Sequence, residues 1–259
     1  MGIRRNASTL SAAEVEALRQ SFNAVYGLRD DRGYGYFAGL HGLPLPVYCE
    51  HGTSLFLPWH RAYLYFFERA LQDQVAEANL PWWDWTSAAA HEQGLPPAYL
   101  PSGATAPANP LAAGPVTLSA DDLTLVRANL PGAITAGSQP VTRRDPDFPD
   151  ELPRPATVSR ALNSRTFNSF NMLLEGIHNG VHVWVGGAMS AVPVAAYDPV
   201  FWAHHSMVDR LWYLWQISPR GVNPPAALLD RPLPPFPMTV RDTLDISTLG
   251  YEYAVQVIG

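Results

Sequence analysis

Apolar residues recur at helical spacing in several separate parts of the chain. In the first part, these apolar positions are Leu10, Val15, Leu18 and Phe22. Together with nearby polar residues that can cap a helix, the pattern predicts a surface helix over residues 9–27 whose N-cap is Thr9 or Ser11. Residues 58–75 are rich in helix formers and aromatic side chains, and they begin with a proline, which the first turn of a helix tolerates. This segment is predicted to be a second helix.

Helical periodicity returns in the second half of the chain. It runs over residues 165–183, stops at the Gly186-Gly187 pair, and resumes over residues 199–216. Between the two halves, residues 94–157 hold many of the 25 prolines, separated by short helical or extended pieces. The sequence therefore predicts an all-α helix bundle with long proline-rich surface loops and little β structure.

The composition fits one domain that acts on a small molecule. A chain of 259 residues with 47% hydrophobic content and eight tryptophans can bury a sizeable core. The net charge of −6 is spread over both halves, and no basic run is longer than two arginines. This argues against nucleic acid or an anionic membrane as a partner. No stretch approaches the roughly 18 apolar residues of a membrane-spanning helix.

The N-terminal segment and the cysteine count bear on the cellular compartment. The first residues lack the apolar core of a secretory signal, so we expect a cytoplasmic protein unless a helper protein exports it. The single cysteine, Cys49, excludes an intrachain disulfide.

Seven of the eight histidines fall into two groups. The first group is His41, His51 and His60, and the second is His178, His182, His204 and His205. His178 and His182 are four residues apart on a predicted helix, so both imidazoles lie on one face and can chelate one metal in a bundle interior. His204 or His205 can supply a third ligand from a facing helix.

An isolated pair of histidines four residues apart is commonly a surface feature, but other residues here favour a metal centre. The apolar span between His51 and His60 directs both towards the interior, where unpaired imidazoles are costly. Binuclear iron and zinc sites rely on carboxylates as ligands and bridges, whereas the candidate ligands of both groups here are histidines. An all-nitrogen donor set favours a pair of copper ions that binds dioxygen.

Two long segments resemble the copper signatures of tyrosinases. They read HGTSLFLPWHRAYLYFFE and DPVFWAHHSMVDRLW, and the segments PWWDWTS and VRDTLDISTLGYEY also resemble the core domain of this family. The resemblance covers nearly the whole chain. It implies a single tyrosinase-like core domain over residues 1–259 without a C-terminal shielding domain, two copper ions as cofactors, and dioxygen as co-substrate.

The resemblance also implies roles for individual residues. The first copper would be bound by His41, His51 and His60, and the second by His178, His182 and His205, with His204 beside the ligands. Cys49 would form a thioether to His51, which would fix the imidazole rotamer. The alternative is a reduced, buried cysteine packed as a small hydrophobe.

Hydroxylation of a monophenol requires a base for the phenol proton, and Glu175 together with Asn179 is the candidate. In tyrosinases, a glutamate and an asparagine so placed are thought to hold a water that takes the phenol proton. Glu175 precedes His178 by three residues and shares its side of the helix, although it could instead face solvent.

Val183 and Val192 are expected to line an open, apolar substrate pocket, which suggests a neutral or bulky phenol.

Three functions follow from this resemblance. The first is o-hydroxylation of monophenols with oxidation of o-diphenols to o-quinones. The second is catechol or o-aminophenol oxidation without hydroxylation, and the third is an oxygen carrier like haemocyanin. A helper protein that delivers copper is a further expected partner. Asp84 and Asp209 orient ligands or are structural, and Asp209 could equally form a buried ion pair with its neighbour Arg210. Tyr251 and Tyr253 are expected to pack against Arg4 or Arg5.

Overall fold

The computed structural model describes residues 1–44, 46–103 and 108–254. The first predicted helix is α1 (Ala12–Gly27), and its N-cap is Ser11. The Ser11 hydroxyl accepts from the backbone N–H of Glu14, whose carboxylate accepts from the backbone of Ser11, so the two residues form a capping box. Thr9 lies just before it, in the short helix η1 (Ala7–Thr9).

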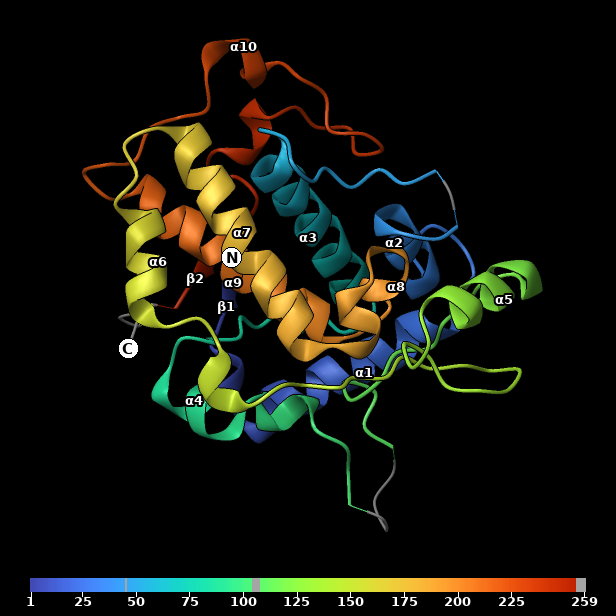
Figure 1. Cartoon of the computed structure of the whole chain (residues 1–259). Helices are drawn as coiled ribbons and strands as arrows, with labels where there is room; N and C mark the ends of the chain where they lie inside the picture. Colours follow the sequence, from blue (N-terminus) through green and yellow to red (C-terminus); the bar gives the residue numbers. More distant parts are fainter. Residues whose placement is uncertain (45, 104–107, 255–259) are drawn as a thin grey trace.

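The three other predicted helices form the centre of the molecule (Figure 1). They are α3 (Phe56–Gln72), α7 (Phe167–Val185) and α9 (Val200–Gln216). The helix α3 packs against both α7 and α9, and aromatic rings fill the core around them. Phe67 stacks on Trp202 with ring centroids 3.7 Å apart, and Phe170 stacks on Trp215 at 4.3 Å. The prediction of an all-α bundle is confirmed.

Smaller helices surround this centre. They are α2 (Tyr34–His41), α4 (Ala88–Gln93), α5 (Ala120–Asn129), α6 (Pro155–Leu162), α8 (Val192–Ala195), α10 (Ala226–Leu229) and the short helices η2 (Pro97–Tyr99), η3 (Pro149–Glu151), η4 (Gly187–Ser190) and η5 (Arg241–Thr243). The predicted excursion over residues 94–157 therefore contains one ordinary helix, α5, and the start of another, α6; its residues 104–107 lie outside the described part. Within the described residues, no helix is both long and apolar enough to cross a bilayer.

The two ends of the described chain meet in a parallel strand pair. The strands are β1 (Gly2–Arg4) and β2 (Tyr251–Tyr253), with Arg4 opposite Tyr253. The Arg4 guanidinium lies 3.6 Å from the Tyr251 ring centroid, so Arg4 makes the expected cation–π contact. Arg5 instead pairs with Glu14 at the surface.

Asp209 lies beneath this strand pair, and its contacts are structural. Its carboxylate accepts from Arg61 Nε at 2.5 Å and from Arg4 at 3.1 Å, and from the hydroxyls of Tyr251 and Tyr253 at 2.7 and 2.5 Å. The ion-pair interpretation of Asp209 therefore holds, but with these arginines as partners. Its neighbour Arg210 lies over the ring of Trp82.

Asp84 is also engaged in local structure. Its carboxylate accepts from the backbone N–H and the hydroxyl of Thr86, which closes a tight turn. These bonds occupy Asp84 Oδ1, so its observed role is to hold the turn.

Candidate metal centre

The second histidine group lies between α7 and α9. His205 Nε2 is 3.2 Å from His178 Nε2 and 3.2 Å from His182 Nε2. Three nitrogens at such separations can each lie about 2.0–2.1 Å from one ion, the usual metal–imidazole distance. The spacing of His178 and His182 on one helix and the position of His205 on the facing helix thus bring three ligand atoms together.

The first group combines two helices and a loop. His41 is the last residue of α2, His60 lies in the second turn of α3, and His51 lies in the loop between them. Their ring centroids are 5.1 Å (His41–His51), 5.3 Å (His51–His60) and 5.8 Å (His41–His60) apart. His60 also stacks on His205 at 4.6 Å, so the two groups adjoin. Within each group, one potential ligand atom per histidine lies within 4.8 Å of the others.

Three of the imidazoles are oriented by bonds at Nδ1. His60 Nδ1 lies 2.8 Å from the Phe56 carbonyl, His182 Nδ1 lies 2.7 Å from the Met189 carbonyl, and His178 Nδ1 lies 3.0 Å from Asn179 Oδ1. Because each partner is an acceptor, we assign the proton to Nδ1, which leaves the Nε2 lone pair for a metal. Such bonds are the usual support of a ligating histidine.

Burial keeps these imidazoles neutral. Desolvation lowers the pKa of His60, His178 and His205 well below the ordinary value, and the neighbouring histidines lower it further. Burial lowers the pKa of His182 to about 4. Neutral imidazole is the form that binds a metal ion.

An orphaned nitrogen supports metal binding in the first group. Among the described residues, His60 Nε2 is buried and has no hydrogen-bond partner, an arrangement that is costly in a dry interior. A metal ion would satisfy it. The donors are all imidazole nitrogens, which suits copper, so the residues fit the cofactor that the sequence predicts.

His204 lies beside the three expected ligands of the second group. Its ring is stacked on His178, with centroids 5.0 Å apart and planes 17° apart, and one of its nitrogens lies within the same 4.8 Å group. Four histidines therefore meet where three ligands are expected. The assignment of His205 as the ligand stays a prediction, and it agrees with the 3.2 Å separations between Nε2 atoms.

A cavity of about 350 Å³ opens onto both histidine groups. It is lined by His41, His51, Glu175, His178, Asn179, His182, Val183, Met189, Ser190, Val192 and Ala195. Val183 is 70% exposed and Val192 is 47% exposed, so the cavity reaches the surface between them. Both valines thus lie where a substrate pocket was expected. Met189, Ser190 and Ala195 were not anticipated, because only the folding of the 186–198 loop brings them to the cavity.

Glu175 lies in the wall of this cavity rather than facing bulk solvent. Its Oε1 accepts from the backbone N–H of Gly52 at 2.6 Å, and only 7% of the residue is exposed. Burial raises the pKa of the Glu175 carboxyl, and the bond from Gly52 opposes that rise. Asn179 lines the same cavity and has its Oδ1 next to the His178 ring, so its amide NH₂ is left for other partners.

Cys49 adjoins the first histidine group. Its Sγ lies 3.5 Å from His51 Nδ1 and donates to the His41 carbonyl at 3.1 Å. Burial raises the pKa of the thiol to about 12, so the thiolate is scarce at neutral pH. The cysteine is a free thiol in this structure, and the thioether to His51 stays a prediction.

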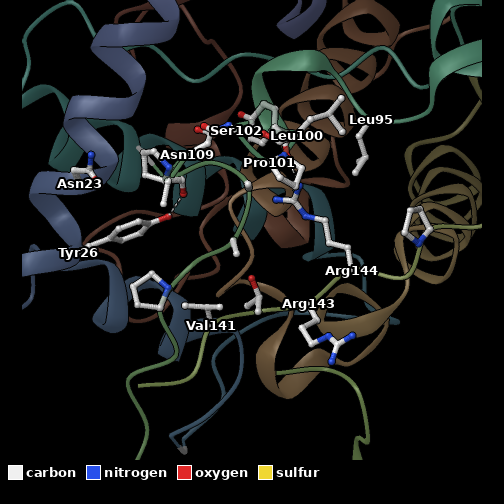
Figure 2. Close-up of a pocket in the computed structure, with 18 residues that line it drawn as sticks. Asn23, Tyr26, Leu95, Leu100, Pro101, Ser102, Asn109, Val141, Arg143 and Arg144 are labelled. Carbon is white, nitrogen blue, oxygen red and sulfur yellow. Dashed lines mark hydrogen bonds between the residues drawn. The ribbon is translucent and has the colours of Figure 1, made fainter. Parts of the chain in front are cut away.

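A larger cavity of about 950 Å³ lies elsewhere, with Tyr26, Arg143 and Arg144 in its wall (Figure 2). Its lining is mainly apolar and includes no histidine. Arg144 forms a bidentate ion pair with Asp198, with nitrogen–oxygen distances of 2.7 and 2.9 Å, so its charge is already matched. The groups suited to redox or proton chemistry therefore gather at the smaller cavity.

Comparison with known proteins links this arrangement to copper proteins. The family model described as the common central domain of tyrosinase matches residues 31–218. The tyrosinase of Streptomyces lincolnensis is 35% identical over 237 residues, which cover 83% of this chain and 83% of that protein. Haemocyanin units G and H of Sepia officinalis are 33% identical over 228 residues, which cover 83% of this chain but 37% of that protein.

Among solved structures, a functional unit of octopus haemocyanin superposes with a TM-score of 0.78 at 26% identity, covering 98% of this chain and 68% of that one. The chain thus spans much less than the full length of the cuttlefish relative, and about two thirds of the octopus unit.

Proposed function

Because the chain belongs to the tyrosinase family of type 3 copper proteins, we propose that it is a phenol oxidase that hydroxylates monophenols and oxidises o-diphenols to o-quinones. His41, His51 and His60 would hold one copper ion, and His178, His182 and His205 the other. The copper pair, when bound, supplies the reduction of dioxygen that drives phenol oxidation.

The open cavity supports an enzyme rather than a carrier. Sequence identity does not separate the two, since the chain is 35% identical to a tyrosinase and 33% identical to a haemocyanin. A carrier needs room for dioxygen alone, whereas this cavity of about 350 Å³ has space for a substituted aromatic ring. Its rim of Val183 and Val192 leaves a path for such a ring to enter.

Glu175 carries the proposal of hydroxylation. A phenol has a pKa of about 10, so it needs a base to lose its proton at neutral pH. Glu175 lines the cavity beside His178, and the Gly52 N–H holds one carboxylate oxygen, which leaves the other to accept a proton directly or through water. The raised pKa makes Glu175 a stronger base than an ordinary carboxylate. The free NH₂ of Asn179 would donate to the water that takes the phenol proton and hold it in place.

Catechol or o-aminophenol oxidation without hydroxylation is the second candidate. The contact between Asn179 Oδ1 and His178 Nδ1 favours it, because an amide committed to orienting a ligand has one acceptor fewer for a water. The deciding experiment compares turnover and lag phase of the copper-loaded chain on a monophenol, the matching diphenol and an o-aminophenol. Hydroxylation after a lag supports our proposal, and reversible oxygen binding without turnover would support a carrier.

Replacing Glu175 by glutamine is expected to reduce monophenol hydroxylation by about 10²–10⁴-fold, the range typical of a lost general base. Oxidation of the diphenol should change only a few-fold, because the glutamine amide oxygen can still accept from Gly52. Initial rates on p-cresol and 4-methylcatechol measure the split. Glu151→Gln, at an exposed glutamate, is the matched control. Equal loss on both substrates would refute the role as a base.

Cys49 is expected to lose its thiol after copper loading in air. A bond from Sγ to a ring carbon of His51 would release the thiol hydrogen and one ring hydrogen, with two electrons passing to dioxygen. Intact-mass measurement should show the loss of two hydrogens, not reversed by reductant, in the wild-type chain but not in Cys49→Ala. A thiol that remains fully titratable would rule the thioether out.

A further inference from the structure

We propose that a cleft beside the catalytic cavity selects phenols that carry a cationic group on a flexible substituent, and that the Asp145 carboxylate recognises that cation. This inference rests on the proposed phenol oxidation and adds a substrate class to it. The sequence favoured a neutral phenol because the residues expected in the pocket wall, Val183 and Val192, carry no charge. The charged group lies further along the surface.

The cleft adjoins the catalytic cavity. Its volume is about 290 Å³, and it is lined by Asn129, Leu130, Pro131, Gly132, Ala133, Asp145, Gly187, Ser190 and Ala191. Ser190 lines both spaces, and the next two residues divide between them, with Ala191 in the cleft and Val192 in the cavity. A ring bound in the cavity can therefore extend a substituent past Ser190 into the cleft.

Backbone contacts fix Asp145 relative to the histidines. The Asp145 N–H donates to the Val185 carbonyl at 3.0 Å, at the end of the helix that carries His178 and His182. Gly186 has a φ of 64°, and a Cβ there would collide with the Asp145 carbonyl, so the glycine permits this close approach. The sequence indicated only that the glycine pair ends a helix. In the structure, Gly186 also allows the segment that carries Asp145 to pack closely against the end of α7.

The charges around the two spaces favour a cation. Among the described residues, the Asp145 carboxylate has no hydrogen-bond or ion-pair partner, and no arginine lines either space. Arg143 bonds through its backbone to Ala133 and Ala188 beside the cleft, but it lines the larger cavity and neither of these two spaces. The charge of Arg144 is matched by Asp198. The C-terminal end of α7, close to Asp145, adds the negative end of a helix dipole. A substituent bearing an ammonium group would be attracted, and one bearing a carboxylate would be repelled.

The expected selectivity is moderate because Asp145 is exposed. Two unit charges about 4 Å apart in water attract enough to change binding about five-fold. For the copper-loaded chain at low salt, we expect kcat/KM for tyramine to exceed that for para-ethylphenol by about five-fold. para-Hydroxyphenylpropionate should be poorer than para-ethylphenol. Because exposed charges are screened, 0.5 M salt should shrink these differences.

Asp145→Asn is the test. It should remove the preference for tyramine and leave kcat/KM for para-ethylphenol within about two-fold, since only the charge is lost. Asp147→Asn, in the same exposed segment but outside both linings, is the matched control and should keep the preference. Turnover of para-ethylphenol without a preference for tyramine, or a preference that survives in Asp145→Asn, overturns the role of the cleft and leaves the proposed function standing. No turnover of any of the three phenols overturns both.

Discussion

His205→Ala is expected to lower the copper content of the reconstituted chain from two ions to one and to abolish measurable phenol oxidation. The reason is geometric, since His205 Nε2 lies 3.2 Å from both His178 Nε2 and His182 Nε2 and is the only one of the three from α9. Loss of a residue that merely supports a ligand typically lowers metal affinity or activity by about 10–100-fold, so loss of the ligand itself should exceed about 100-fold. Metal analysis after dialysis and initial rates on 4-methylcatechol measure the two effects.

Two further variants make this result specific. His204→Ala removes the neighbouring imidazole, which stacks on His178, and should keep both copper ions with at most about a ten-fold loss of activity. His91→Ala removes a histidine outside both groups and should change neither quantity. If His204→Ala lost a copper ion and His205→Ala kept both, the ligand assignment in the second group would be reversed. Circular dichroism of each variant checks that the helices are intact.

Local patterns in the sequence were sufficient to predict the positions of site residues that lie on a single helix. The spacing of His178, His182 and Glu175 places all three along α7, and a helix has the same geometry wherever it occurs. The same holds for His60, whose Nδ1 contacts the carbonyl one turn earlier, at Phe56. These positions follow from backbone geometry that the sequence specifies within a few residues.

The parts that depend on distant segments could not be predicted in the same way. The helix α2, which ends at His41, contains two glycines and is buried on nearly every side, so it shows little amphipathic periodicity. The bond from Gly52 to Glu175 and the cleft around Asp145 each join segments far apart in the chain. Such contacts depend on how the elements pack, which periodicity does not report.

The partners of Asp209 also lie in distant segments, and replacing this residue is expected to lower the stability of the fold strongly. The sequence suggested a ligand-orienting group or an ion pair with its neighbour, whereas the structure pairs the carboxylate with Arg61 and Arg4 from distant segments. Asp209→Asn removes the negative charge but keeps the volume, which leaves two buried guanidinium groups less well matched. Breaking a buried pair in this way typically costs about 3–5 kcal/mol, so we expect the free energy of unfolding to fall by that amount. The corresponding decrease in Tm is roughly 10 °C.

Urea unfolding of the metal-free chain measures this effect without a contribution from copper binding. Asp230→Asn is the matched control, because its pair with Arg241 is exposed and solvent should screen the loss. The Asp230 side chain is 79% accessible, against 3% for Asp209.

Burial alone would raise the pKa of Asp209, but Arg61, Arg4 and Tyr253 outweigh it and hold the pKa below its ordinary value. The stabilisation is therefore fully present at neutral pH and is lost as the pH falls below about 4, so the gap between wild type and Asp209→Asn should narrow there. A gap of less than about 1 kcal/mol at neutral pH would show that the network contributes little to stability.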